Sequence, residues 1–292
     1  MSEVAGVVLA GGRSTRMGRP KANLEWHGST LLHRVTGIVS RAVDGPVVVV
    51  RAPDQELPPL PPGVRVADDA AEGRGPLQGL AAGLAAVAGE AEVAYVSSTD
   101  VPLLHPAFVR AVVGSANGRS ATGAGASGDP VDVALPVVHG FRHPLSAAYR
   151  TSLLPDVEEL IAEDRMRPAF LFERSTVREL GEEELLANSE LAAADPELLS
   201  VLNLNEPDDY ERARARAAPT VTVRRFGTLA TNLGREPIAI RAATLEAAAR
   251  AAGVALDRHV VAALNGDQIT RDPELPLAGG DEIAFLAADA GG

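Results

Sequence analysis

Short apolar runs alternate with longer helix-like stretches through the first two thirds of the chain. The runs are rich in valine and apolar at successive positions, which is typical of strands buried on both faces of a parallel sheet. Strands that alternate with helical stretches indicate crossover connections. The pattern therefore predicts an α/β domain with a mostly parallel sheet and helices on both faces. The expected strands are 4–10, 46–51, 63–69, 93–98 and 133–138, and the expected helices lie near 30–42, 76–88 and 105–113.

The pattern changes after a charged helix predicted over residues 207–218. Beyond Pro219, apolar and polar residues alternate with a period of two, as in strands with one buried face. We expect a first domain over 1–218 and a small α+β domain of the ubiquitin-like, β-grasp kind over 219–292. The expected elements of the second domain are strands at 220–226, 237–240, 260–269 and 279–287 and a helix at 244–252, with an Asn-Gly hairpin turn at 265–266.

Glycine and aspartate residues stand at the carboxyl ends of three predicted strands. Gly11 and Gly12 follow the first strand, Asp68 and Asp69 end the third, and Asp100 follows the fourth. In an open parallel sheet the carboxyl ends of the strands meet at one edge, where ligands bind. We therefore expect these residues to converge on one crevice.

The loop after the first strand has the composition of a phosphate-binding loop. Gly11 and Gly12 allow backbone N–H groups to approach a phosphate, and Arg16 and Lys21 supply two cations. The spacing fits neither common phosphate motif: Lys21 comes three residues after Gly18, and the glycines are adjacent to each other. A loop of another class is expected.

Composition narrows the function classes. A net charge of −12 and a pI near 5.0 argue against non-specific binding to nucleic acid or to an anionic membrane. The chain has no cysteine, which excludes disulfides, thiolate metal sites and a cysteine nucleophile. The first residues have no basic region and only a short apolar run, so a cytoplasmic enzyme is expected. The acidic stretch 173–190 is interpreted as a helix with a solvated face.

Five ordered motifs together resemble one enzyme family. The opening loop, L-A-G-G-x-S-x-R-M-G-x-x-K, resembles the signature of small nucleotidyltransferases, in particular the molybdenum cofactor guanylyltransferases. The other four are GPLQGLAAGL (75–84), STDVPLL (98–104), HPLSAAYR (143–150) and LNLNEPDD (202–209). The resemblance implies a Rossmann-like domain that transfers GMP from GTP to molybdenum-molybdopterin and releases pyrophosphate.

The resemblance also implies roles for individual residues. Arg16 and Lys21 would bind the phosphates, and Asp100 would hold Mg²⁺. Asp68 would accept from the guanine base, with Asp69 as the second candidate. His143, Asn203 and Asn205 would line the acceptor side. The nucleotide-binding set implied by the family is Leu9, Ala10, Gly11, Gly12, Lys21, Arg51, Asp68, Gly75 and Asp100.

Two departures from the family pattern leave alternatives open. Pro20 stands before the loop lysine where the family often has Asp, and Arg51 ends the second strand where Asn is common. Pro at that place also occurs in the sister cytidylyltransferases. The alternatives are transfer from CTP to molybdopterin, or transfer to a sugar or alditol phosphate.

The second domain resembles a different family. The stretches 221–234, 260–269 and 275–292 are similar to the small sulfur-carrier subunit of molybdopterin synthase, and more distantly to thiamine sulfur carriers. The resemblance implies that Gly292 is adenylated and then carries sulfur as a thiocarboxylate. Its partners would be an adenylating activating enzyme and the large subunit of molybdopterin synthase. The alternative is a docking module whose Gly-Gly sequence does no chemistry.

Overall fold

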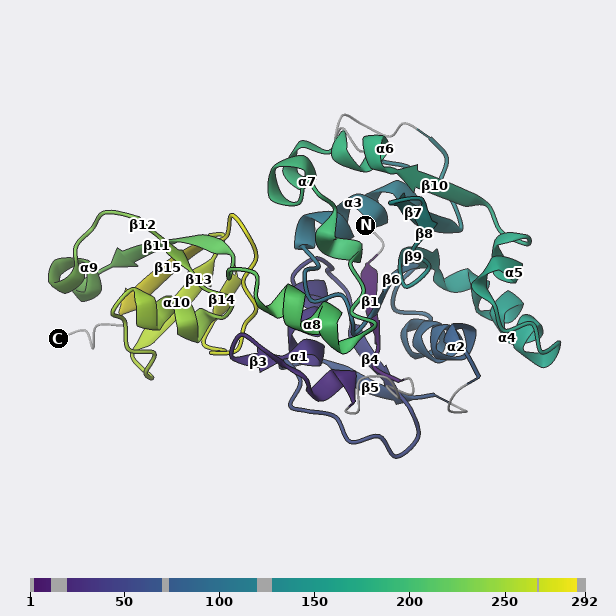
Figure 1. Ribbon diagram of the computed structural model, residues 1–292, viewed down its shortest axis with the longest axis horizontal. Coiled ribbons are helices and arrows are strands. Elements are labelled where there is room, and N and C mark those ends of the chain that lie inside the picture. Colours follow the sequence, from purple (N-terminus) through teal and green to yellow (C-terminus); the bar gives the residue numbers. More distant parts are fainter. Residues whose placement is uncertain (1–2, 12–19, 70–73, 120–127, 267, 288–292) are drawn as a thin grey trace.

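The computed structural model describes residues 3–11, 20–69, 74–119, 128–266 and 268–287. Figure 1 shows a larger lobe built from the first part of the chain and a smaller lobe, green to yellow, built from the last part. Each lobe has its own sheet.

The larger lobe contains an eight-stranded, mostly parallel sheet. Its order is β10-β7-β9-β6-β1-β4-β5, and β8 pairs with β7. The pairs β1·β4, β1·β6, β4·β5 and β7·β10 are parallel, whereas β9 runs antiparallel between β6 and β7. The strands are β1 (Val4–Leu9), β4 (Val47–Arg51), β5 (Arg65–Asp68), β6 (Val93–Ser98), β7 (Val133–Val138), β8 (Phe141–Arg142), β9 (Ser146–Arg150) and β10 (Val177–Gly181).

Helices cover both faces of this sheet, as the valine-rich strands predict. On one face α1 (Leu31–Ser40) and α3 (Pro106–Ala116) pack with Val8, and on the other α2 (Pro76–Val87) and α4 (Leu154–Ala162) pack with Val7. Successive residues of β1 therefore enter different cores, which explains its unbroken apolar sequence. The expectation of an α/β domain with a mostly parallel sheet is confirmed.

The remaining elements of this lobe are short. A small hairpin of β2 (Glu25–Trp26) and β3 (Ser29–Thr30) precedes α1. The others are α5 (Pro168–Phe172), α6 (Glu182–Leu186), α7 (Ser189–Ala194), α8 (Pro207–Arg214) and 3-10 turns at Lys21–Asn23, Thr151–Leu153 and Leu199–Val201.

The interpretation of residues 173–190 as one solvated helix is wrong. Val177–Gly181 forms β10 and pairs in parallel with β7, and the side chain of Leu180 is fully buried. Only Glu182–Leu186 is helical before a second short helix begins at Ser189. The high charge of the stretch hid a strand in which only Leu180 is buried and Arg178 and Glu179 are charged.

The smaller lobe has a five-stranded mixed sheet in the order β12-β11-β15-β13-β14. β11 and β15, which are the first and last strands of this lobe along the chain, are parallel neighbours in the sheet. The other pairs are antiparallel. One face packs on α10 around a separate apolar core. The elements are β11 (Thr220–Phe226), α9 (Thr228–Leu233), β12 (Ile238–Arg241), α10 (Leu245–Ala251), β13 (Val260–Leu264), β14 (Gln268–Thr270) and β15 (Glu282–Ala287).

No helix among the residues that the structure describes is long and apolar enough to span a membrane.

Candidate active site

A cavity of about 460 Å³ opens at the carboxyl ends of β1, β4 and β6. The N-terminal turn of α2 forms another wall. The position is the crevice expected for an open parallel sheet, where strand ends and a helix N-terminus meet. The lining residues are Leu9, Ala10, Gly11, Lys21, Val50, Asp69, Gly75, Pro76, Gly79, Ser98, Thr99, Asp100 and Leu145.

Asp100 lies in this cavity, two residues beyond the last residue of β6. Its Oδ2 is 2.8 Å from Lys21 Nζ, and its Oδ1 accepts a hydrogen bond of 2.5 Å from Ser98 Oγ. Its backbone carbonyl accepts from the Leu204 amide at 2.9 Å. About a fifth of the Lys21 and Asp100 side chains is exposed. The carboxylate is thus held in one orientation while it remains accessible to a ligand.

The turn after β1 is held against the end of β4. The Ala10 amide donates to the Val50 carbonyl at 2.8 Å, and Gln55 Nε2 donates to the Ala10 carbonyl at 3.1 Å. A Cβ added at Gly11 would lie 3.3 Å from the Ala52 backbone nitrogen. Glycine is needed here because the two chain segments approach closely. Gly12 and Arg16 lie outside the described residues.

The first turn of α2 lies against the cavity, which Gly75, Pro76 and Gly79 line. Gly75 is its N-cap with φ of +107°, a conformation that favours glycine, and Pro76 takes the first helical position. Among the described residues no side chain caps this terminus. A Cβ at Gly79 would be 3.3 Å from the Leu9 side chain, so small residues let the helix sit close to β1. A helix terminus of this kind favours an anion.

Of the two acidic residues at the end of β5, Asp69 lines the cavity and Asp68 does not. Asp68 Oδ1 is 2.7 Å from Arg51 Nε, since Arg51 and Asp68 are register partners on β4 and β5. Both side chains of this pair are substantially exposed. Asp69 donates its backbone N–H to the Arg51 carbonyl at 2.7 Å. Arg51 and Asp68 form an ion pair beside the cavity.

The three expected acceptor residues are not among the cavity-lining residues. His143 Nε2 lies 3.2 Å from the Val138 carbonyl, and burial lowers the pKa of its imidazole. Asn203 and Asn205 are exposed on either side of the buried Leu204, whose amide binds the Asp100 carbonyl. The two asparagines therefore lie next in sequence to a residue that contacts the Asp100 backbone.

The donor set around Asp100 fits a magnesium ion that is also bound by substrate phosphates. No cluster of three His, Cys, Asp or Glu side chains that could hold a metal occurs within the described residues. Mg²⁺ commonly binds one or two carboxylates and completes its coordination with phosphate oxygens and water. Asp100 supplies one such carboxylate, and Ser98 supplies a neighbouring hydroxyl oxygen.

Two residues with clear contacts at this site were given no role by the sequence. Ser98 orients the Asp100 carboxylate, and Gln55 holds the Ala10 carbonyl while its Oε1 accepts from the Ala52 amide. Ser98 stands in the STDVPLL motif, two residues before the aspartate, so its position was a usable signal. Gln55 lies in an irregular loop and had no comparable signal.

Comparison with known families matches residues 6–178 to the MobA-like NTP transferase domain. A protein of Mycobacterium avium named "Probable molybdenum cofactor guanylyltransferase" is 36% identical over 191 residues, covering 64% of this chain and 90% of that protein. A molybdenum cofactor guanylyltransferase of Desulfosudis oleivorans is 32% identical over 216 residues, covering 74% of this chain and 96% of that protein.

The solved structures show the same fold. The crystal structure of molybdopterin-guanine dinucleotide biosynthesis protein A from Archaeoglobus fulgidus superposes with a TM-score of 0.54 at 23% identity. It covers 72% of this chain and 96% of its own. The likeness therefore concerns the larger lobe and its sheet.

Proposed function

Because the chain belongs to the MobA-like NTP transferase family and is a nucleotidyltransferase, we propose that it transfers GMP from GTP to molybdenum-molybdopterin and releases pyrophosphate. The observation that carries the proposal is the arrangement of Lys21, Ser98 and Asp100 at the bottom of a cavity walled by the N-terminus of α2. One cation, one oriented carboxylate and the N-terminus of a helix suit a triphosphate and its metal ion.

In the proposed reaction an oxygen of the acceptor's terminal phosphate attacks the α-phosphorus of GTP. A bond forms between that oxygen and the α-phosphorus, and the bond to the bridging oxygen breaks, so that pyrophosphate leaves. A phosphate is already ionised at neutral pH, so no general base is required. Mg²⁺, when bound, would neutralise charge on the α-phosphate and the leaving pyrophosphate. The chain's own contribution is positioning and charge neutralisation by Lys21, the α2 terminus and Asp100.

The other expected roles belong to the same proposal. Leu9 to Gly12 and Gly75 would contact the nucleotide, and Arg16 would join Lys21 on the phosphates. Asp69 is the better placed of the two acidic candidates for the guanine base, because it lines the cavity whereas Asp68 pairs with Arg51. His143, Asn203 and Asn205 would contact molybdopterin.

Replacing Asp100 tests the site. We expect Asp100→Ala to lower pyrophosphate release by about a hundredfold or more, since it removes an oriented charge from a partly buried site. The measurement is pyrophosphate release over a Mg²⁺ titration, with Asp68→Ala, an exposed carboxylate outside the cavity, as the control variant. Full turnover of Asp100→Ala at saturating Mg²⁺ would reject the assignment.

Transfer from CTP, or to a sugar phosphate, is the alternative that keeps the same fold. Pro20 favours it, because the family often has an acidic residue there. The lining of the cavity around Gly11, Lys21 and Asp100 serves the triphosphate of any nucleotide. The identity of the nucleotide base therefore has to be determined from substrate preference in solution.

For the smaller lobe we propose a second domain, residues 219–292, of the β-grasp class that serves as a sulfur carrier for molybdopterin synthesis. Support comes from its strand order, with the first and last strands parallel at the centre, and from its separate apolar core. The proposed attachment site, Gly292, lies outside the described residues. The proposed partners are the adenylating enzyme and the large subunit of molybdopterin synthase.

Mass spectrometry tests the carrier proposal. Protein from cells that contain the activating enzyme should show a sulfur-for-oxygen exchange on the peptide that ends at Gly292. A chain with one residue appended after Gly292 should lose this exchange. Sulfur transfer that survives the appended residue would rule out a thiocarboxylate there, and a uniformly unmodified peptide would favour the docking module.

A further inference from the structure

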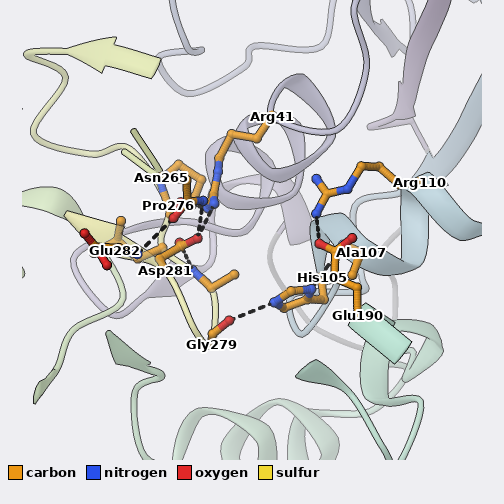
Figure 2. Close-up of polar contacts among 12 residues, drawn as sticks. Arg41, His105, Ala107, Arg110, Glu190, Asn265, Pro276, Gly279, Asp281 and Glu282 are labelled. Carbon is orange, nitrogen blue, oxygen red and sulfur yellow. Dashed lines mark hydrogen bonds and ion pairs between the residues drawn. The ribbon is translucent and has the colours of Figure 1, made fainter. Parts of the chain in front are cut away.

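The smaller lobe rests on α1 and α3 of the larger lobe through one segment. This docking segment, residues 272–281, connects β14 to β15, and Figure 2 shows part of it beside the residues of α1 and α3. Ala278 is buried within the apolar cluster of the larger lobe, together with residues of α1 and α3. Glu274 accepts a hydrogen bond of 3.0 Å from Ser29 Oγ, next to α1. Ala278 is therefore part of the apolar core of the larger lobe, which also contains Val101 and Leu104 from the loop after β6.

A buried ion pair and a close approach set the position of the docking segment. Arg41 donates to the Asp281 carboxylate at 2.6 Å and to the Pro276 carbonyl at 2.8 Å, and the side chains of this ion pair are about 95% buried. A Cβ added at Gly37 of α1 would lie 2.6 Å from Pro276 Cγ. The segment can lie this close to α1 only because position 37 has no side chain.

Two contacts extend from the docking segment to the loop that carries Asp100. This loop, residues 99–105, joins β6 to α3. Arg34 is buried in α1, where its Nε donates to the Pro102 carbonyl and its Nη1 donates to the Leu277 carbonyl at 3.2 Å. The Nε2 atom of His105 is 3.1 Å from the carbonyl oxygen of Gly279. One guanidinium thus connects the docking segment to a residue two positions after Asp100.

The two ends of this loop have different supports. At its beginning, Thr99 Oγ1 donates to the Leu9 carbonyl at 2.9 Å and the Leu204 amide donates to the Asp100 carbonyl, both within the larger lobe. In its second half the His105 amide also donates within the larger lobe, to Ser200 Oγ at 3.0 Å, but the contacts of Arg34 and His105 join this half to residues 277–279. Burial of the Arg34 guanidinium lowers its pKa to about 10, which indicates how strongly the site is desolvated. A buried guanidinium that loses one of its carbonyl partners is costly, so Arg34 should shift when the segment leaves.

We propose that Arg34 is a positioning residue through which the docked smaller lobe orients the Asp100 loop, so that undocking of this lobe weakens nucleotidyl transfer. Arg34 acts through the Pro102 carbonyl and does not touch the cavity. The effect on catalysis rests on the proposed role of Asp100, whereas the effect on the loop does not. A partner that binds the smaller lobe could therefore change the activity of the nucleotide site.

The full chain and four variants test this proposal. Gly37→Ala should push Pro276 away while improving helix propensity, and Arg34→Met removes the connection itself. Gly114→Ala is the matched control, because it is also a helical glycine but an added Cβ would meet only Arg119 Cβ, at 3.8 Å. Hydrogen exchange is followed at the amides of Leu104, His105 and Leu204, which report on the loop.

We expect exchange at these amides to rise about tenfold in Gly37→Ala and Arg34→Met, and to stay unchanged in Gly114→Ala, while β1 and β11 keep their protection. Arg34→Lys should restore part of the protection, because an ammonium can still donate to a buried carbonyl. The Mg²⁺ concentration for half-maximal pyrophosphate release should rise about tenfold in the same two variants, since small misplacement of a positioned group is costly.

The proposal is overturned if Arg34→Met keeps full protection of the loop, or if Gly37→Ala speeds exchange at residues 277–279 without affecting the loop. If Arg34→Met does not fold, loop exchange in Gly37→Ala compared with Gly114→Ala tests the proposal. If Gly37→Ala leaves the segment docked, loop exchange in Arg34→Met tests it. Failure of the proposed function would look different: the unmodified chain would release pyrophosphate from no nucleotide, while the exchange result would still hold.

Discussion

At the scale of single residues, two residues that are adjacent in sequence differ in whether they line the cavity. Asp68 and Asp69 are neighbours at the end of β5, yet Asp68 pairs with Arg51 and Asp69 lines the cavity. Successive residues of a strand point to opposite sides, so a motif that locates an aspartate to within one residue leaves its direction open. Both residues are candidates in the sequence, but the choice between them requires the register of β4 and β5.

This difference gives a prediction about base selection. Asp69→Asn should reduce the preference for GTP over CTP by about tenfold, since a site built to hydrogen-bond a base loses discrimination when one partner is changed. Asp68→Asn is the matched control, with the same chemical change in an exposed ion pair, and should keep the preference. Competition assays that contain both GTP and CTP measure this preference. A reduced preference for GTP in Asp68→Asn, with no change in Asp69→Asn, would assign the base contact to Asp68.

At the scale of elements, hydrophobic pattern predicted the strands and helices that are buried on both sides. The strands β1, β4 and β6 and the helices α1, α2 and α3 lie where the apolar runs and helical stretches indicated. Strands β9 and β10 were not predicted as strands. The place of β9 between β6 and β7 depends on a reversal of chain direction, which leaves no local signal. β10 is charged, and only Leu180 among its residues is buried.

The packing of α2 on β1 gives a prediction about stability. A Cβ at Gly83 would overlap the Val7 side chain, which is fully buried in the sheet. Gly83→Ala should therefore lower the free energy of unfolding by about 1–3 kcal/mol, because overpacking outweighs the gain in helix propensity. Gly114→Ala in α3 should be neutral or stabilising. Denaturant unfolding measures the free energy of unfolding of both variants. A higher value for Gly83→Ala than for the unmodified chain would contradict the prediction and show that α2 can move away from β1 at little cost.

The N-terminus of α3 gives a prediction about pH. His105 Nδ1 accepts from the Ala107 amide, and burial, the main cause, lowers the pKa of the imidazole below its usual 6.5. Because the unfolded chain then binds a proton more readily, this contribution to stability is present above pH 6.5 and is lost as pH falls below it. His105→Asn keeps a capping side chain but does not titrate.

Denaturant unfolding between about pH 7.5 and pH 5 checks this. The loss of unfolding free energy on acidification should be smaller in His105→Asn than in the unmodified chain. Equal slopes in the two proteins would mean that His105 titrates alike when folded and unfolded.

At the scale of the whole molecule, the sequence predicted two parts but not how they contact each other. The change of period after Pro219 indicates a second sheet, and the structure has one from Thr220 onward. The contact between the lobes depends on Gly37, Arg34 and Arg41, which in the sequence are unremarkable positions of one helix. Their partners in the smaller lobe are more than 200 residues away, as in the Arg34–Leu277 and Arg41–Asp281 contacts. Only the folded arrangement joins the Asp100 loop to the smaller lobe.

Guanylyl transfer to molybdopterin, in the cavity at the ends of β1, β4 and β6, is the activity proposed for this chain. It is tested most directly by pyrophosphate release from GTP, CTP and ATP, each with and without molybdenum-molybdopterin, in the presence of Mg²⁺. We predict release from GTP that depends on the acceptor, and release from CTP and ATP that is lower by at least about tenfold. Faster release from CTP, or release from GTP that ignores molybdopterin and requires a sugar phosphate, would contradict the claim.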